Sequence, residues 1–241
     1  MTLPPMRQLT LDLLPEAAPS LDNFVAGGNG EALAGLAAWL TPDNRESALY
    51  LWGEAGAGKT HLLRASGAHY HDGAADPDLA GGAESSEPAG LHAVDNVEAL
   101  GEAGQIALFN LFNRLRAAGG KLLTAGTQPP QQLKLREDLR TRLGYGLIYR
   151  LLPLTDAEKI AALAAQAAAR GLRLPPDALD YLLARAPRDM RSLSALLAAL
   201  DRYSLEQKRP ITLPLLREVL QGPHGAGPAA PGSLPPENRH A

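Results

Sequence analysis

Short apolar runs and amphipathic stretches alternate along the chain as far as residue 153. Runs of about five mostly apolar residues, typical of buried strands, lie at 48–52, 91–95, 121–125 and 147–151. Apolar residues at helical spacing lie at 31–40, from 60 to about 70, and at 104–118. In the last of these helices, Ile106, Leu108 and Phe112 are among the expected apolar positions. This order predicts an α/β domain over residues 21–153.

Beyond Pro153 the pattern contains only helices. Thr155 and Glu158 have the spacing of a capping box, in which each side chain accepts a hydrogen bond from a free N–H group of the first turn. Three more helices are expected to begin at Pro176, at Asp189 and after Thr212. We therefore predict a small helical lid over residues 154–221.

Three segments lack the large apolar residues that a packed core requires. Residues 1–20 contain four prolines and are predicted to form a flexible arm. Residues 71–90 are rich in Gly, Ala, Ser and acidic residues, which is typical of an exposed loop. The tail at 222–241 buries too little apolar surface to fold, so we expect it to be disordered.

Composition narrows the class of protein. The 241 residues suffice for one large domain, or for one domain with a small partner, and a net charge of −3 argues against bulk coating by nucleic acid. Because the chain contains no cysteine, disulfides and thiolate nucleophiles are excluded. No apolar run reaches the ~20 residues of a membrane span, and the N-terminus lacks the pattern of a signal peptide. We expect a cytoplasmic protein without membrane contact.

The stretch Gly53–Thr60 has the phosphate-binding pattern G-x-x-x-x-G-K-[ST], between a predicted strand and a predicted helix. Glycines let successive N–H groups point at one phosphate, and the helix N-terminus adds partial positive charge. Lys59 is expected to reach the β- and γ-phosphates, and the Thr60 hydroxyl to hold Mg²⁺. A Gly-rich turn that matches by chance is the alternative. The predicted phosphate-binding residues are Gly53, Gly56, Ala57, Gly58, Lys59, Thr60 and His61.

Asp95 ends the second predicted strand and has the form of a Walker B acid, which binds Mg²⁺ through water. An ordinary strand end is the alternative. Asn96 follows, where most hydrolysing relatives carry an acid, and its neutral amide can orient water but is a poor proton acceptor. The sequence thus predicts a nucleoside di- or triphosphate bound with Mg²⁺ at Thr60 and Asp95, and slow hydrolysis.

Further polar residues are candidates with open alternatives. Thr127, after the third strand, can sense the γ-phosphate or simply form a turn. Arg142, before the fourth strand, has the place of an arginine that stabilises charge on a neighbouring subunit's nucleotide, although a solvated surface arginine is also consistent. Arg191, early in the third lid helix, can reach the phosphates from the lid. Selection of the base would involve residues near Phe24 and Val25, where no base-specific pattern is readable.

In this order the motifs resemble an AAA+ module, and several of them resemble the Hda family of regulatory inactivators related to the bacterial initiator DnaA. The resemblance covers about residues 7 to 220. The segments that support it are Gln8–Leu13, Asp22–Val25, Gly56–Leu63, Val94–Glu98, Pro129–Leu133, Asp138–Leu143 and Met190–Leu193. It implies a parallel sheet between helical layers, followed by an α-helical lid. The edge strand usual for this fold is not apparent in residues 71–90.

The resemblance also implies a regulatory function. Hda-type proteins bind ADP, dock on the DNA-loaded sliding clamp (the β subunit of DNA polymerase III) and stimulate ATP hydrolysis by DnaA, which gives negative regulation of replication initiation. Arg142 would then be an arginine finger acting in trans and Arg191 the lid sensor. The clamp-binding residues would be Gln8, Leu9, Leu11 and Leu13. Contact with DNA would be indirect, through the clamp, and self-association is left open.

Two other functions stay open at this stage, as does the choice between ADP and ATP. Asn96 counts against an autonomous AAA+ ATPase such as a motor or loader. A DnaA-like protein that binds DNA itself is disfavoured because no helix-turn-helix is readable after residue 222 and the net charge is negative. Arg142 and the N-terminal peptide favour the regulator over both.

Overall fold

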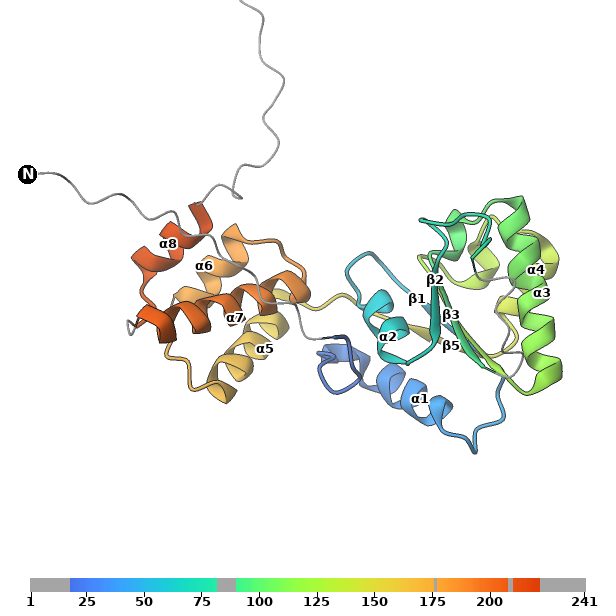
Figure 1. The fold of residues 1–241 in the computed structure, drawn as a ribbon, viewed down its shortest axis with the longest axis horizontal. Coiled ribbons are helices and arrows are strands. Elements are labelled where there is room, and N and C mark those ends of the chain that lie inside the picture. Colours follow the sequence, from blue (N-terminus) through green and yellow to red (C-terminus); the bar gives the residue numbers. More distant parts are fainter. Residues whose placement is uncertain (1–17, 82–89, 176, 208–209, 222–241) are drawn as a thin grey trace, which may run out of the picture. The chain divides into compact units, whose positions relative to one another are not determined.

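A computed structural model describes residues 18–81, 90–175, 177–207 and 210–221 (Figure 1). It forms two compact units, one that ends at Glu158 and one that begins at Lys159. The predicted clamp-binding peptide, Pro176 and the 222–241 tail lie outside the described residues. Within the described part, no helix is long and apolar enough to cross a membrane.

A five-stranded sheet forms the centre of the first unit, with the strand order β2-β3-β4-β1-β5. The strands are β1 (Ala48–Trp52), β2 (His69–Asp72), β3 (Leu91–Asp95), β4 (Lys121–Gly126) and β5 (Leu147–Arg150). In register, Leu49 of β1 lies opposite Leu123 of β4 and Leu147 of β5. Because all pairs are parallel, the carboxyl ends of the strands share one edge, where loops can build a common site.

Helices cover both faces of this sheet, which confirms the predicted fold class (Figure 1). The flanking elements are η1 (Gly27–Asn29), α1 (Gly30–Leu40), α2 (Lys59–Ala65), η2 (Val97–Ala99), α3 (Glu102–Ala118), η3 (Pro130–Gln132) and α4 (Glu137–Leu143). Alternate residues of β1 face opposite layers: Leu49 and Leu51 pack with α1 and α2, whereas Tyr50 packs with α3 and α4. Burial on both faces explains why the central strands read as continuous apolar runs.

The helix predicted from residue 60 to about Tyr70 is wrong in its second half. α2 ends at Ala65, and His69–Asp72 form the edge strand β2 instead. Gly67 has a left-handed φ of +73°, which ends the helical path. The Ser66 hydroxyl donates to the Leu63 carbonyl and accepts from the Ala68 N–H group, which closes the turn. The edge strand that the sequence did not reveal is therefore present.

Three smaller features differ from the prediction: the burial of one residue, the exposure of another, and an additional short helix. Leu79 belongs to the predicted exposed loop but is only 2% exposed and joins the core beneath α3. Ile106 is 41% exposed, because it lies two residues before Leu108 and hence on the opposite side of the helix. Helix α4 was not predicted, since seven residues with four charges show little apolar periodicity.

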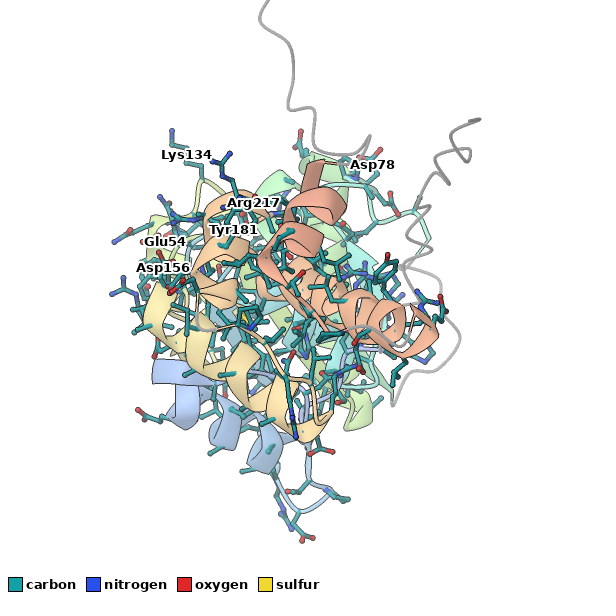
Figure 2. The ribbon with its side chains drawn as sticks, turned by 90° about the vertical axis from the view of Figure 1, so that its left-hand side faces the viewer. Glu54, Asp78, Lys134, Asp156, Tyr181 and Arg217 are labelled. Carbon is teal, nitrogen blue, oxygen red and sulfur yellow. The ribbon has the colours of Figure 1, made fainter. Side chains whose placement is uncertain are left out.

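The described residues of the second unit form four helices: α5 (Asp156–Ala169), whose first turn belongs to the first unit, α6 (Ala178–Arg185), α7 (Met190–Gln207) and α8 (Leu213–Gln221). The predicted capping box is confirmed, since the Thr155 N–H and hydroxyl both donate to Glu158 Oε2 at 2.8 Å and the Glu158 N–H donates to Thr155 Oγ1 at 3.2 Å. Leucines and alanines fill the interior. Figure 2 shows Tyr181 of α6 beside Arg217 of α8, whose guanidinium carbon is 5.9 Å from the ring centroid.

Three histidine rings pack together at the β2–β3 edge of the sheet. His69 and His71 alternate with Tyr70 along β2, so both lie on the side of the buried His92 of β3. The ring centroid of His92 is 5.2 Å from that of His69 and 5.9 Å from that of His71. Burial and the neighbouring His69 lower the pKa of His71 below its ordinary 6.5, and Asp76 opposes this shift.

We expect acid to destabilise the chain partly through His71. The unfolded chain takes up a proton near the ordinary pKa of 6.5, whereas the folded chain resists it. Stability is therefore complete above that pKa and falls as the pH drops below it. Between about pH 7.5 and about pH 5.5, the midpoint temperature of thermal unfolding should fall less for His71→Gln than for the native chain. Equal shifts in the two proteins would contradict this assignment.

Candidate functional site

The loop between β1 and α2 requires glycine at two positions for identifiable reasons. Gly58, directly before α2, has a φ of +94°, and a Cβ atom there would lie 2.6 Å from the ring of Phe24. A Cβ atom on Gly53 would lie 2.2 Å from the carbonyl oxygen of Leu151, too close for any side chain. The glycines of the phosphate-binding pattern thus permit a tight loop that packs against neighbouring segments.

Lys59 is held inside this loop. Its side chain is only 8% exposed, and its ammonium donates to the carbonyl oxygens of Gly53 at 2.6 Å and Glu54 at 2.9 Å. Burial lowers the pKa of Lys59, while the nearby carboxylates of Asp95 and Glu98 favour the charged form. A phosphate group that enters the loop meets a cation whose present partners are neutral carbonyls, so exchanging one of them for an anion is favourable.

Asp95 and Thr60 are brought into direct contact. The Asp95 carboxylate is fully buried, and its Oδ2 accepts from the Thr60 hydroxyl at 2.5 Å and from the Tyr70 hydroxyl at 3.1 Å. Its Oδ1 accepts from the Asn96 N–H group at 2.9 Å. A carboxylate and a hydroxyl oxygen side by side are hard ligands of the kind that Mg²⁺ binds through one or two side chains and several waters. The two residues predicted to hold Mg²⁺ therefore fit that ion.

Tyr70 and Arg64 belong to the same cluster and were not predicted. The guanidinium carbon of Arg64 is 4.5 Å from the centroid of the Tyr70 ring. Burial and the Asp95 carboxylate raise the pKa of Tyr70 to about 12, so its hydroxyl keeps its proton and donates to Asp95. A signal was present in the sequence: His69–Asp72 is a short segment that ends in an acid, just as Leu91–Asp95 does.

Asn96 faces the edge of the sheet. Its backbone is left-handed, with φ 52° and ψ 46°, a conformation that asparagine tolerates better than most residues. The side-chain amide donates to Asp72 Oδ1 at 2.8 Å, and Asp72 also accepts from the N–H group of Ala74. The amide predicted to orient a water molecule is thus occupied by the carboxylate at the end of β2.

Other predicted residues lie around the loop. The Phe24 ring centroid is 5.5 Å from that of His61, and His61 Nε2 lies 3.0 Å from the Ser20 carbonyl oxygen. Val25, next to Phe24, is half-buried. Thr127 is exposed and directly follows β4 at the carboxyl edge of the sheet. Gly56 and Ala57 complete the loop, and Arg191 lies in the first turn of α7 in the helical unit.

Arg142 lies apart from this cluster. It is near the end of α4, shortly before the amino end of β5, and α4 belongs to the layer opposite α2. Its guanidinium carbon is 5.7 Å from the ring centroid of Phe109 and 5.6 Å from that of Phe112, both on α3. Arg142 is therefore a half-buried cation on an aromatic surface, and it is not grouped with the chain's own Lys59 and Asp95.

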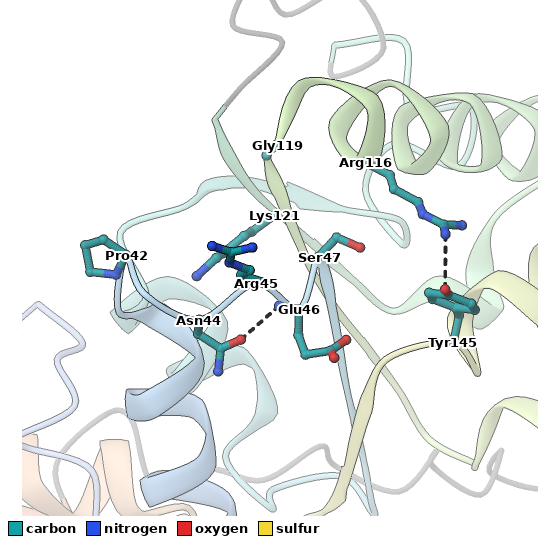
Figure 3. Close-up of a pocket in the computed structure, with 10 residues that line it drawn as sticks. Pro42, Asn44, Arg45, Glu46, Ser47, Arg116, Gly119, Lys121 and Tyr145 are labelled. Atoms are coloured by element: carbon teal, nitrogen blue, oxygen red, sulfur yellow. Dashed lines mark hydrogen bonds between the residues drawn. The ribbon is translucent and has the colours of Figure 1, made fainter.

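A cavity of about 460 Å³ lies at the amino ends of the strands, opposite the edge where their carboxyl ends meet (Figure 3). It is lined by residues that precede or begin strands, among them Ser47, Lys121 and Tyr145. The Arg116 guanidinium donates to the Tyr145 hydroxyl at 3.1 Å. The Lys121 ammonium donates to the carbonyl oxygens of Trp39, in the last turn of α1, and of Thr41, directly after that helix. Because the phosphate-binding loop follows the carboxyl end of β1, this cavity is separate from it.

Comparisons with known proteins agree with this architecture. Residues 156–220 match the family model described as the lid domain of Hda. Domain III of the replication initiation protein DnaA from Thermotoga maritima is similar to 86% of this chain over 97% of its own length, with 22% identity and a TM-score of 0.66. AMPPCP-bound DnaA from Aquifex aeolicus is similar to 79% of this chain over 69% of its own length, with 24% identity and a TM-score of 0.59.

The same fold extends to other proteins. RuvB from Thermotoga maritima is similar to 87% of this chain over 72% of its own length, with 20% identity and a TM-score of 0.61. At these identities the solved structures establish the fold, and the lid match adds the relation to Hda. The chain thus has the fold of domain III of DnaA, and its residues 156–220 are similar to the lid domain of Hda.

Proposed function

We propose that this chain is a nucleotide-bound AAA+ regulator that binds ADP or ATP with Mg²⁺ at the Gly53–Thr60 loop and acts on DnaA. The observation that supports nucleotide binding best is the Thr60–Asp95 contact beside the buried Lys59, because it joins a phosphate-binding cation to a pair of Mg²⁺ ligands. The AMPPCP-bound DnaA with the same fold favours an adenine nucleotide.

In this proposal each residue of the cluster has a distinct task. The Lys59 ammonium leaves at least one loop carbonyl and donates to a phosphate oxygen. The Thr60 hydroxyl and the Asp95 carboxylate would hold Mg²⁺, which would supply neutralisation of the phosphate charge. The Tyr70 hydroxyl keeps the Asp95 carboxylate oriented, and Phe24 packs against the loop at Gly58.

The regulatory part of the proposal concerns a second nucleotide, bound by DnaA. A residue that acts in trans must lie away from its own site, as Arg142 does on α4, and the lid match to Hda supports a role of this type. Docking on the DNA-loaded sliding clamp through Gln8, Leu9, Leu11 and Leu13 would raise the local concentration of Arg142 near DnaA, because it makes their encounter effectively intramolecular.

A hydrolysis assay tests this function directly. DnaA loaded with ATP is mixed with clamp-loaded DNA and the intact chain, and formation of ADP on DnaA is followed. We expect the intact chain to accelerate hydrolysis and deletion of residues 1–14 to remove most of that acceleration, because docking is lost. The deletion should leave nucleotide binding by the chain unchanged.

A narrower pair of variants provides the control. Replacing Leu11 and Leu13 together with alanine should reproduce the deletion, whereas Leu3→Ala, outside the peptide, should behave as the native chain. Undiminished acceleration by both the deletion and the double variant would refute clamp docking through this segment. No acceleration by the intact chain at any concentration would refute the action on DnaA.

A further inference from the structure

The fold places Glu98 at a position that no spacing in the sequence predicts. Helix η2 turns the chain after β3 and brings Glu98 to the end of β4. A Cβ atom added to Gly126 would lie 2.9 Å from Glu98 Oε2 and 2.3 Å from the Tyr50 hydroxyl oxygen. The carboxylate can lie against the backbone there because residue 126 has no side chain. Burial and, to a smaller extent, the Glu98 carboxylate raise the pKa of the Tyr50 hydroxyl.

The two carboxylates near Lys59 differ in what holds them. Asp95 is fully buried and accepts three hydrogen bonds. Glu98 is exposed, and within the part of the chain that the structure describes its carboxylate accepts no hydrogen bond and forms no ion pair. Gly126, against which Glu98 lies, accepts a hydrogen bond from the N–H group of Gly53 at 3.3 Å, so Glu98 lies beside the start of the phosphate-binding loop. Both carboxylates favour the charged form of Lys59. One carboxylate is thus fixed by donors, and the other is near the same cation with its oxygens accessible to water.

We propose that Glu98, rather than Asn96, is the catalytic base for hydrolysis of a triphosphate in this chain's own site. The inference rests on the proposed nucleotide binding and deepens it. A water oxygen forms a bond to the γ-phosphorus as the bond from that phosphorus to the β–γ bridging oxygen breaks. The electron pair leaves with the diphosphate, and the water proton goes to the Glu98 carboxylate. Asn96 orders the end of the sheet by binding Asp72.

The test uses the full chain with ATP and Mg²⁺ under single-turnover conditions, with ADP formation as the readout of the chemical step. Nucleotide affinity is measured separately with a fluorescent ATP analogue. The variants are Glu98→Gln, which keeps the shape but cannot accept a proton, and Glu98→Asp, which keeps a carboxylate. Glu102→Gln serves as the matched control, since Glu102 is an exposed acid in the first turn of α3.

We expect Glu98→Gln to slow hydrolysis by at least about tenfold and up to the ~10²–10⁴-fold typical of a general base. Its affinity for the analogue should stay within about threefold of the native value, which corresponds to less than one kcal/mol. Glu98→Asp should retain part of the rate, and Glu102→Gln most of it.

Two results would overturn the role of Glu98. One is hydrolysis by Glu98→Gln at the native rate. The other is tight binding of ATP by the native chain with no hydrolysis above that of Glu98→Gln. A native chain that binds no nucleotide would instead refute the proposed function on which the inference rests, so the affinity measurement separates the two failures.

Discussion

Lys59→Ala is expected to weaken binding of ADP or ATP by about 100-fold or more. A hydrogen bond to a charged group contributes about 1.5–3 kcal/mol, and Lys59 is placed to donate more than one to the phosphates. Because Lys59 is buried inside the loop, we expect no other lysine of the chain to reach the phosphates in its place. Isothermal titration with nucleotide and Mg²⁺ measures the loss.

Lys134→Ala is the matched control for this measurement. Lys134 is exposed and lies between η3 and α4, where Figure 2 shows it at the surface. It should bind nucleotide as the native chain does. Removal of Lys59 also leaves the carbonyls of Gly53 and Glu54 without their donor, so thermal unfolding of the nucleotide-free proteins should be compared. Native affinity in Lys59→Ala would exclude the loop as the nucleotide site.

Arg142→Ala is expected to remove the acceleration of DnaA-bound ATP hydrolysis, while nucleotide binding by the chain itself stays native. An arginine finger supplied in trans contributes about 10³–10⁵ in rate, so most of the acceleration should disappear. The chain's own affinity should not change, because α4 is in the layer opposite α2. The readout is ADP formation on DnaA with clamp-loaded DNA.

Two companion variants separate a catalytic from a structural effect of Arg142. Arg140→Ala, on the same helix, should keep the acceleration. Arg142→Lys retains a cation over Phe109 and Phe112 but not the planar fork of donors, so it should remain deficient if the guanidinium contacts a phosphate. Thermal unfolding measures the packing effect of Arg142, which is half-buried, since a cation–π contact is worth about 0.5–1 kcal/mol when exposed and about 2 kcal/mol when desolvated. Full acceleration by Arg142→Ala would exclude the finger.

Much of the sheet was predictable because its central strands are buried on both faces. The central strands β1, β3 and β4 appear in the sequence as apolar runs, and so does the partly buried edge strand β5, whose Leu147, Ile148 and Tyr149 are apolar. β2 does not, since its residues His69, Tyr70, His71 and Asp72 are polar or amphipathic and the strand lies at the edge of the sheet. Its stability comes from pairing with β3 and from ring packing on His92, neither of which has a signature in local hydropathy.

The candidate site divides in the same way. Lys59 and Thr60 are adjacent in one motif, and Asp95 ends an apolar strand, so a local pattern suffices to find them. Tyr70 could not be found by spacing, because its contact with Asp95 depends on the parallel register of β2 and β3. The position of Glu98 depends on the turn that follows Asn96, and hence on the left-handed backbone of Asn96. The sequence allows this conformation at an asparagine but does not predict it.

The packing of Phe24 on Gly58 limits how the chain can be divided for experiments. Asn23 accepts from the Ser20 N–H group and donates to the Ala18 carbonyl, and the Ser20 carbonyl lies against His61 of α2. Any partner that displaces residues 18–25 also changes the wall of the phosphate-binding loop, and thermodynamic linkage makes that coupling reciprocal. Truncations and fusions that reach past Ala18 therefore affect both nucleotide binding and partner docking. Those that end before Ala18 can report on docking alone.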